Sequence, residues 1–314
     1  MIRGRRAPRG SVDLSVEVGS VRLPNPVMTA SGTAGHGAEL GAHVDLGGLG
    51  AVVVKSLSAQ PWPGNPPLRV HHTPAGMINS VGLQGPGVEA WLAHDLPPLI
   101  DAGARVVVSI WGRTVEEYRA AAEAVAAAPP EVVAVEVNLS CPNLSGHGIF
   151  AQSAADSAAV IEAAAVCGRP RWAKLTALVT DLPAIAGAVL DAGAEALTLI
   201  NTVPGLVVDL DDRRAVLGGG SGGVSGPAIH PVAVKAVSDC RVAHPDAPII
   251  GVGGIATGAD AIEMLMAGAD AVQVGTATFA DPRSVAKVLH QLEHWCVDHG
   301  ITRVADLTGA AHDR

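Results

Sequence analysis

Eight short runs of β-branched and other apolar residues recur along this chain, and they limit its possible folds more than any other feature. They are residues 26–32, 51–56, 105–110, 132–139, 172–176, 196–202, 248–253 and 271–275. Most of these runs are almost wholly apolar, as strands buried on both faces are. Helical patterns lie between them. Thr114 and Glu117, for example, have the spacing of a capping box, and Pro129 and Pro130 end the alanine-rich helix that this box opens.

A strand followed by a helix, eight times in 314 residues, predicts an α/β fold of the (β/α)₈ TIM-barrel type. A doubly wound open sheet is the alternative, but eight such units form a closed barrel more readily than an open sheet. Residues 13–23 fall outside the eightfold count. Gly19 and Ser20 separate two alternating runs there, so we predict a β-hairpin at the bottom of the barrel. Residues 13–314 are expected to form one domain, and residues 1–12 a flexible basic tail.

Composition excludes several classes of protein. The net charge of −9 argues against a nucleic-acid partner. No apolar run reaches the ~18 residues of a membrane span, and no apolar stretch follows the basic N-terminus as in a signal peptide. The four cysteines, Cys141, Cys167, Cys240 and Cys296, show neither CxxC nor metal-ligand spacing. We therefore expect a protein of the reducing cytoplasm without a metal site.

Polar residues follow the predicted strands at the ends where barrel enzymes carry their chemistry. They are Ser31, Lys55, Asn138, Asn143, Lys174, Asn201 and Thr202. Two of them, Lys55 and Lys174, lie in runs that should be buried, and a buried lysine needs an anionic partner. They suggest a ligand with delocalised negative charge, such as a reduced flavin. Two lysines that extend to solvent along the rim are the alternative.

Turns that contain glycine close the last two predicted strands. Gly253-Gly254 and Gly275-Thr276 would let backbone N–H groups approach an anion, and these two loops are the usual phosphate site of the barrel. The glycine-rich residues 218–227 add a third loop, which we expect to be flexible; a disordered insertion is the alternative.

The stretch VEVNLSCPNLSGHG, residues 135–148, ends a strand with Asn138, Cys141 and Asn143 close together. It is either a loop of turn formers with an idle thiol or a reaction site. With NPVMTASGT, VVVKS, GMINSVGLQGPG, NLSCPN, INT, GGVSGPAIHP, GVGGI and QVGTATF, the chain resembles the class 1 dihydroorotate dehydrogenases over nearly its whole length. INT and ADAVQVGTATFADP are most similar to the NAD-linked subclass.

The resemblance implies FMN-dependent oxidation of dihydroorotate to orotate in pyrimidine biosynthesis, with the hydride passing to FMN and a proton to Cys141 as base. The residues implied to contact FMN are Ala30, Ser31, Lys55, Asn138, Lys174, Gly226, Gly253, Gly254, Gly275 and Thr276. Those implied to hold dihydroorotate are Lys55, Asn79, Gly82, Leu83, Asn138, Asn143, Asn201 and Thr202, with backbone N–H groups around Gly82 and Leu83 meeting its carboxylate. Asn side chains suit the alternating N–H and C=O groups of this ring, because each offers one acceptor and two donors.

The resemblance also implies a homodimer and, from the NAD-linked subclass, a second subunit with FAD and an iron–sulfur cluster. The final acceptor stays open between NAD through such a partner, fumarate and another oxidant. Residues 175–182 and the lid loop at residues 143–153 depart from the family's pattern. Three alternatives are a related FMN enzyme acting on another cyclic amide such as a dihydropyrimidine, a flavin-free phosphate-binding isomerase or aldolase, and an inactive barrel that serves as a binding partner.

Overall fold

The structure, a computed structural model, describes residues 11–140 and 150–312. Eight parallel strands in that part of the chain follow the order β3-β16-β15-β10-β9-β8-β7-β4. They are β3 (Val27–Thr29), β4 (Val52–Val53), β7 (Val106–Ile110), β8 (Val132–Asn138), β9 (Arg171–Lys174), β10 (Ala196–Leu199), β15 (Ile249–Val252) and β16 (Ala271–Val274). Each overlaps one of the predicted runs, so the TIM barrel is confirmed.

The threonine hydroxyl of Thr29 helps to close the barrel where the two end strands, β3 and β4, meet. Thr29 N–H donates to the Ala51 carbonyl at 3.3 Å, and Gly50 N–H donates to Val27 at 2.9 Å. Thr29 Oγ1 then accepts from Val53 N–H at 2.8 Å and donates to the Val53 carbonyl at 3.2 Å. A side chain thus takes the place of backbone pairing at this seam.

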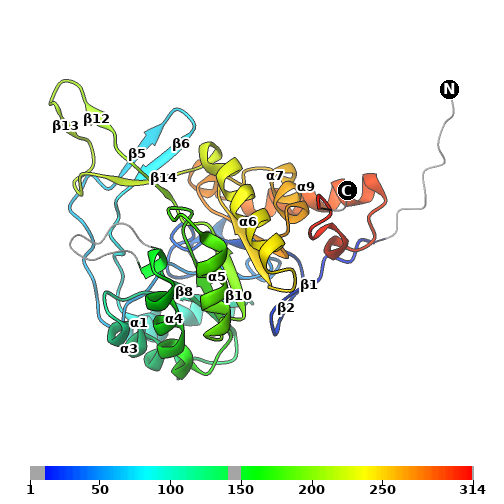
Figure 1. The fold of residues 1–314 in the computed structure, drawn as a ribbon, viewed down its shortest axis with the longest axis horizontal. Coiled ribbons are helices and arrows are strands. Elements are labelled where there is room, and N and C mark those ends of the chain that lie inside the picture. The colour runs from blue at the N-terminus through cyan, green and yellow to red at the C-terminus, as the bar shows by residue number, and fades with distance from the viewer. Residues whose placement is uncertain (1–10, 141–149, 313–314) are drawn as a thin grey trace.

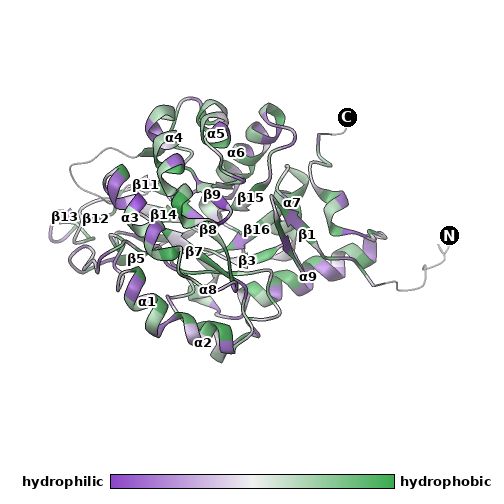
Figure 2. Ribbon diagram, turned by 90° about the horizontal axis from the view of Figure 1, so that it is seen from below, coloured by the Kyte–Doolittle hydropathy of each residue, from purple (hydrophilic) through white to green (hydrophobic). Residues whose placement is uncertain are grey.

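Helices surround the strands (Figure 1). They are α1 (Val88–His94), α2 (Leu96–Asp101), α3 (Val115–Val125), α4 (Ala154–Ala163), α5 (Leu182–Asp191), α6 (His230–Ala243), α7 (Gly258–Met266), α8 (Ala277–Ala280) and α9 (Ser284–His299). Short 3₁₀ turns are η1 (Glu39–Ala42), η2 (Phe150–Gln152), η3 (Ala164–Cys167), η4 (Pro227–Ile229) and η5 (Val304–Leu307). Strands such as β7 and β8 are mostly hydrophobic, whereas the helices carry both hydrophobic and hydrophilic residues (Figure 2).

The predicted capping box of α3 forms only in part. Thr114 Oγ1 accepts from Glu117 N–H at 3.2 Å, as an N-cap should. The Glu117 carboxylate, however, accepts from the Arg113 backbone N–H at 2.7 Å and pairs with the Arg113 guanidinium. The glutamate therefore turns one residue further back, because a cation competes for it there.

The predicted hairpin is β1 (Val16–Val18) paired with β2 (Val21–Leu23). Its turn residue Ser20 donates from both N–H and Oγ to Glu195 Oε2, at 3.0 and 2.6 Å. Glu195 directly precedes the first residue of β10, so the hairpin lies at the N-terminal end of the strands, the bottom of the barrel. The expected tail falls largely on residues 1–10, outside the described residues, and the division into tail and domain stays a prediction.

A second sheet, which the sequence did not predict, lies at the end of the barrel opposite to the β1–β2 hairpin (Figure 1). It has the antiparallel order β11-β14-β6-β5, formed by β11 (Val203–Gly205), β14 (Gly222–Ser225), β6 (Gly76–Asn79) and β5 (Val70–Thr73). A hairpin of β12 (Val208–Asp209) and β13 (Arg214–Ala215) extends from it.

The flexible loop expected at residues 218–227 is therefore a misassignment, because residues 222–225 form strand β14. Its glycines serve close packing instead. A Cβ on Gly222 would lie 2.5 Å from the Asn79 carbonyl oxygen, and one on Gly223 would lie 2.0 Å from Thr202 Oγ1. Within the described residues, no helix is both long and apolar enough to cross a membrane.

The seam at Thr29 can be tested with a matched pair of buried threonines. Thr29→Val removes the hydroxyl that accepts from the buried Val53 N–H, so we expect it to lower the free energy of unfolding by about 1–3 kcal/mol. In Thr198, the hydroxyl is buried without a hydrogen-bond partner among the described residues. Thr198→Val should therefore leave stability unchanged or raise it. Urea unfolding measures both, and equal effects would contradict the role of the seam.

Candidate active site

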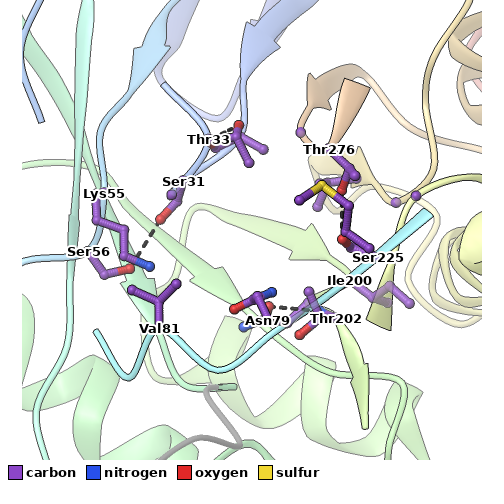
Figure 3. Close-up of a pocket in the computed structure, with 18 of the residues that line it drawn as sticks. Ser31, Thr33, Lys55, Ser56, Asn79, Val81, Ile200, Thr202, Ser225 and Thr276 are labelled. Carbon is purple, nitrogen blue, oxygen red and sulfur yellow. Dashed lines mark hydrogen bonds between the residues drawn. The ribbon is translucent and has the colours of Figure 1, made fainter. Parts of the chain in front are cut away.

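One pocket opens at the C-terminal ends of the barrel strands, under the second sheet, with a volume of about 1070 Å³ that includes its open mouth. Every barrel strand end except that of β7 supplies residues to its lining, and β6 and β14 add residues from above. Figure 3 shows side chains from these separate segments pointing into the same space. The chain thus has a cavity where barrel enzymes place their chemistry.

The structure gathers the predicted site residues around this pocket. Its lining includes Ala30, Ser31, Lys55, Asn79, Gly82, Leu83, Asn138, Lys174, Asn201, Thr202, Gly226, Gly253, Gly254, Gly275 and Thr276. Cys141 and Asn143 lie outside the described residues, as does most of the predicted lid loop. The individual roles of all these residues stay predictions.

Glycine backbone forms one side of the pocket. Gly253 and Gly254 have φ angles of +142° and +69°, and a Cβ on Gly254 would lie 2.7 Å from His230 Cβ. The N–H groups of Gly253, Gly254, Gly275 and Thr276 have no acceptor among the described residues. Backbone N–H groups that lack a partner beside a cavity suit an anion such as a phosphate.

A carboxylate buried inside the barrel balances one of the two lysines. Lys174 Nζ lies 3.5 Å from Glu136 Oε1, and the Glu136 side chain is fully buried. Ser109 donates to Glu136 Oε1 at 3.2 Å, and Gln273 donates to Oε2 at 2.9 Å. The anionic partner that a buried Lys174 requires is thus part of the protein. Glu136 is not among the residues predicted from the sequence, although a lone acid within an apolar strand was a signal for it.

Ser56 connects this buried cluster to the pocket. Its Oγ lies 2.9 Å from Ser109 Oγ and 3.1 Å from Ser31 Oγ, and it accepts from Asn138 Nδ2 at 3.0 Å. Figure 3 shows Ser31, Lys55 and Ser56 grouped on one side of the pocket. Ser56 is a second residue that the sequence analysis missed, and its place directly after Lys55 was the available signal.

Amide side chains lie at the pocket ends of β8 and β10. Asn201 Nδ2 donates to Ser140 Oγ at 2.9 Å, and its Oδ1 accepts from Thr202 N–H at 2.8 Å. Tyr118 fixes the same strand end by donating to the Asn138 carbonyl at 2.7 Å. The amides are therefore held in position before any ligand arrives.

The other three cysteines are buried in helices away from the pocket. Burial raises the pKa of the Cys240 thiol to about 12, and it also raises the pKa of the Cys167 and Cys296 thiols. These groups stay protonated at neutral pH. Among the four cysteines of the chain, Cys141 is the one for which a chemical role remains open.

The barrel and its pocket define an enzyme that can bind a phosphate at one side and a polar ring among its amides. Residues 13–296 match the family model of dihydroorotate dehydrogenase. The chain is 47% identical over 303 residues to the dihydroorotate dehydrogenase B (NAD(+)) catalytic subunit of Desulforudis audaxviator, covering 96% of this chain and 98% of that protein. The subunit of the same name from Geobacter sulfurreducens is 44% identical over 300 residues, covering 95% and 98%.

This chain belongs to the dihydroorotate dehydrogenase family, whose reaction is the oxidation of dihydroorotate to orotate in pyrimidine biosynthesis. Members of the family generally use FMN. The match confirms the predicted family, its NAD-linked subclass and the reaction. It gives no support to the isomerase, aldolase and binding-partner alternatives.

The pair of Glu136 and Lys174 can be tested in the protein without ligand. Glu136→Gln or Lys174→Met leaves one buried charge without its partner, so each should cost about 3–5 kcal/mol of unfolding free energy. The double variant should cost less than the sum, by about 0.5–3 kcal/mol. Asp239→Asn and Lys235→Met, in an exposed pair at 2.7 Å, provide the control cycle and should be nearly additive. Additivity in the buried cycle as well would contradict the pairing.

Proposed function

We propose that this chain oxidises dihydroorotate to orotate with FMN bound in the barrel pocket and Cys141 as the base. One observation carries the proposal: a single pocket combines two lysines, a set of fixed amides and glycine-turn N–H groups that no described residue accepts from. The N–H groups suit a phosphate, the lysines suit an electron-rich ring, and the amides suit a polar substrate. Family membership supports the same assignment.

The residues present fit FMN. Gly253, Gly254, Gly275 and Thr276 would hold its phosphate with their N–H groups, and Lys174 would lie near its ring system. When bound, FMN supplies the acceptor for the hydride that leaves dihydroorotate. The ammonium group of Lys174 is held in place by Glu136 at 3.5 Å, so it favours negative charge that develops beside it without first having to reorganise.

The amides would select the substrate ring. Asn79, Asn138 and Asn201 come from three different segments of the pocket lining. A ring that lacked one of the N–H or C=O groups of dihydroorotate would leave a buried amide unpaired, and such sites reject analogues strongly. Asn143 would complete the set, from the segment outside the described residues.

Cys141 would take the proton from the ring carbon next to the one that loses the hydride. It directly follows Ser140, whose hydroxyl contacts Asn138 and Asn201 inside the site. With the other three thiols buried and protonated, it is the cysteine that the chain offers for this step.

We expect Cys141→Ala to retain FMN and to bind orotate, but to reduce its flavin with dihydroorotate about 10²- to 10⁴-fold more slowly, which is the usual contribution of a general base. The native rate should rise with pH as the thiol ionises, and the variant should lack this rise. Stopped-flow absorbance measures both. Cys167→Ala removes a buried thiol and should behave as the native protein. A native rate in Cys141→Ala would show that the thiol is not the base.

The relatives are named catalytic subunits of NAD(+) enzymes, which implies an electron-transfer partner. FMN and dihydroorotate would together account for the barrel pocket. The route from FMN to NAD would therefore run through a partner subunit that carries FAD and an iron–sulfur cluster. The homodimer and the cytoplasmic location stay predictions of the sequence.

The chain alone should then oxidise dihydroorotate with an artificial acceptor such as dichlorophenolindophenol but scarcely with NAD. Steady-state assays of the purified chain with each acceptor make this comparison. Efficient reduction of NAD by the chain alone would contradict the need for a partner.

A further inference from the structure

A tight turn in the pocket wall has backbone donors from which no described residue accepts. Gly82 and Leu83 have consecutive positive φ angles of +71° and +61°, and both residues are buried. A positive φ is strained for leucine, so it persists only where its surroundings enforce it. The N–H groups of Gly82 and Leu83 have no acceptor among the described residues. Buried backbone N–H groups in native proteins are almost always paired. Two such groups that no described residue accepts from, in the wall of a pocket, are therefore available to a ligand.

The neighbouring loop, residues 61–65, fixes the carbonyl groups of this turn. The indole Nε1–H of Trp62 donates to the Gly82 carbonyl at 3.0 Å. The Asn65 backbone N–H donates to the Val81 carbonyl at 3.0 Å, and the Trp62 backbone N–H donates to the Gly85 carbonyl at 2.9 Å. The carbonyls of the turn thus face this loop.

Because the carbonyl groups of the turn are fixed, the planar peptide bonds fix the direction of its N–H groups as well. In a trans peptide the C=O and the following N–H point in opposite directions. Because Trp62 holds the Gly82 carbonyl, the Leu83 N–H must point away from Trp62. Gly82 and Leu83 line the pocket, whereas Trp62 is not among its lining residues. The Leu83 N–H therefore points toward the pocket.

We infer that Trp62 is a positioning residue: its indole N–H fixes the Gly82–Leu83 peptide so that this turn presents its N–H groups to the carboxylate of the substrate. The inference rests on the proposed function, which binds dihydroorotate in this pocket, and on the family resemblance, which implies that the substrate carboxylate meets this turn. The indole is itself held. Its ring makes an edge contact with Trp111 at 5.6 Å between centroids, and the Arg113 guanidinium lies 4.9 Å over it.

The matched variants are Trp62→Phe and Trp111→Phe. Both remove an indole N–H and reduce ring size, but the buried Trp111 Nε1 has no hydrogen-bond partner among residues 11–140 and 150–312, so its loss costs none of the hydrogen bonds described there. The substrate carboxylate keeps its charge throughout the reaction, so a weaker hold on it should raise KM and leave kcat unchanged. In the FMN-loaded protein, Trp62→Phe should weaken orotate binding about tenfold, the equivalent of one hydrogen bond to a charged group.

Spectral titration of the flavin with orotate and steady-state kinetics with dihydroorotate measure these effects. The inference is supported if Trp62→Phe raises the Kd for orotate and the KM while Trp111→Phe does not. It is wrong if Trp62→Phe binds orotate with native affinity, if kcat falls with KM unchanged, or if Trp111→Phe weakens orotate equally, because ring packing would then explain the loss.

A second measurement needs no variant. In the native FMN-loaded protein labelled with [¹⁵N]leucine, the Leu83 amide signal should move when orotate is added. An unmoved Leu83 signal in a protein that binds orotate would overturn the inference. A native protein that binds no orotate would instead contradict the proposed function itself.

Discussion

The ion pair between Glu136 and Lys174 makes a charged binding site possible inside an otherwise apolar barrel. A lone ammonium or carboxylate at this depth would be strongly destabilising, and each neutralises the other at 3.5 Å. Ser109 on β7 also donates to Glu136 Oε1, and Gln273 on β16 donates to the other carboxylate oxygen, Oε2. The Glu136 carboxylate on β8 is thereby linked to β7, β9 and β16. The Lys174 ammonium group lines the pocket and stays buried.

The other polar groups of the site are connected to this ion pair by hydrogen bonds or lie around it. Ser109 and Ser56 carry the hydrogen-bond network to Ser31 and Asn138 at the pocket surface. On one side, glycine turns after β15 and β16 expose backbone N–H groups. Above, the second sheet brings Asn79 and Thr202 over the cavity, through contacts that only glycine at positions 222 and 223 allows. A rigid barrel thus supports polar groups that come from separate parts of the chain.

The sequence predicted the barrel because fully buried strands leave nearly continuous apolar runs, and it predicted the pocket residues because chemistry collects at one end of such strands. It did not predict the second sheet. Strands β5, β6, β11 and β14 are short and rich in glycine, proline and polar residues, so no alternation marks them. Lys174 suggested an external anion, because nothing in the sequence shows that Glu136 on the adjacent strand reaches it. The role of Trp62 depends on a carbonyl 20 residues away and cannot be found in a local motif.

The central claim is that this pocket passes electrons from dihydroorotate to bound FMN. An anaerobic titration of the purified chain with dihydroorotate tests it most directly, by following the flavin absorbance. We expect the protein to carry FMN, and the flavin absorbance to fall as dihydroorotate is added until one equivalent has been consumed, with orotate as the product. A chain that takes up no FMN, or whose bound flavin stays oxidised in excess dihydroorotate, would contradict the account.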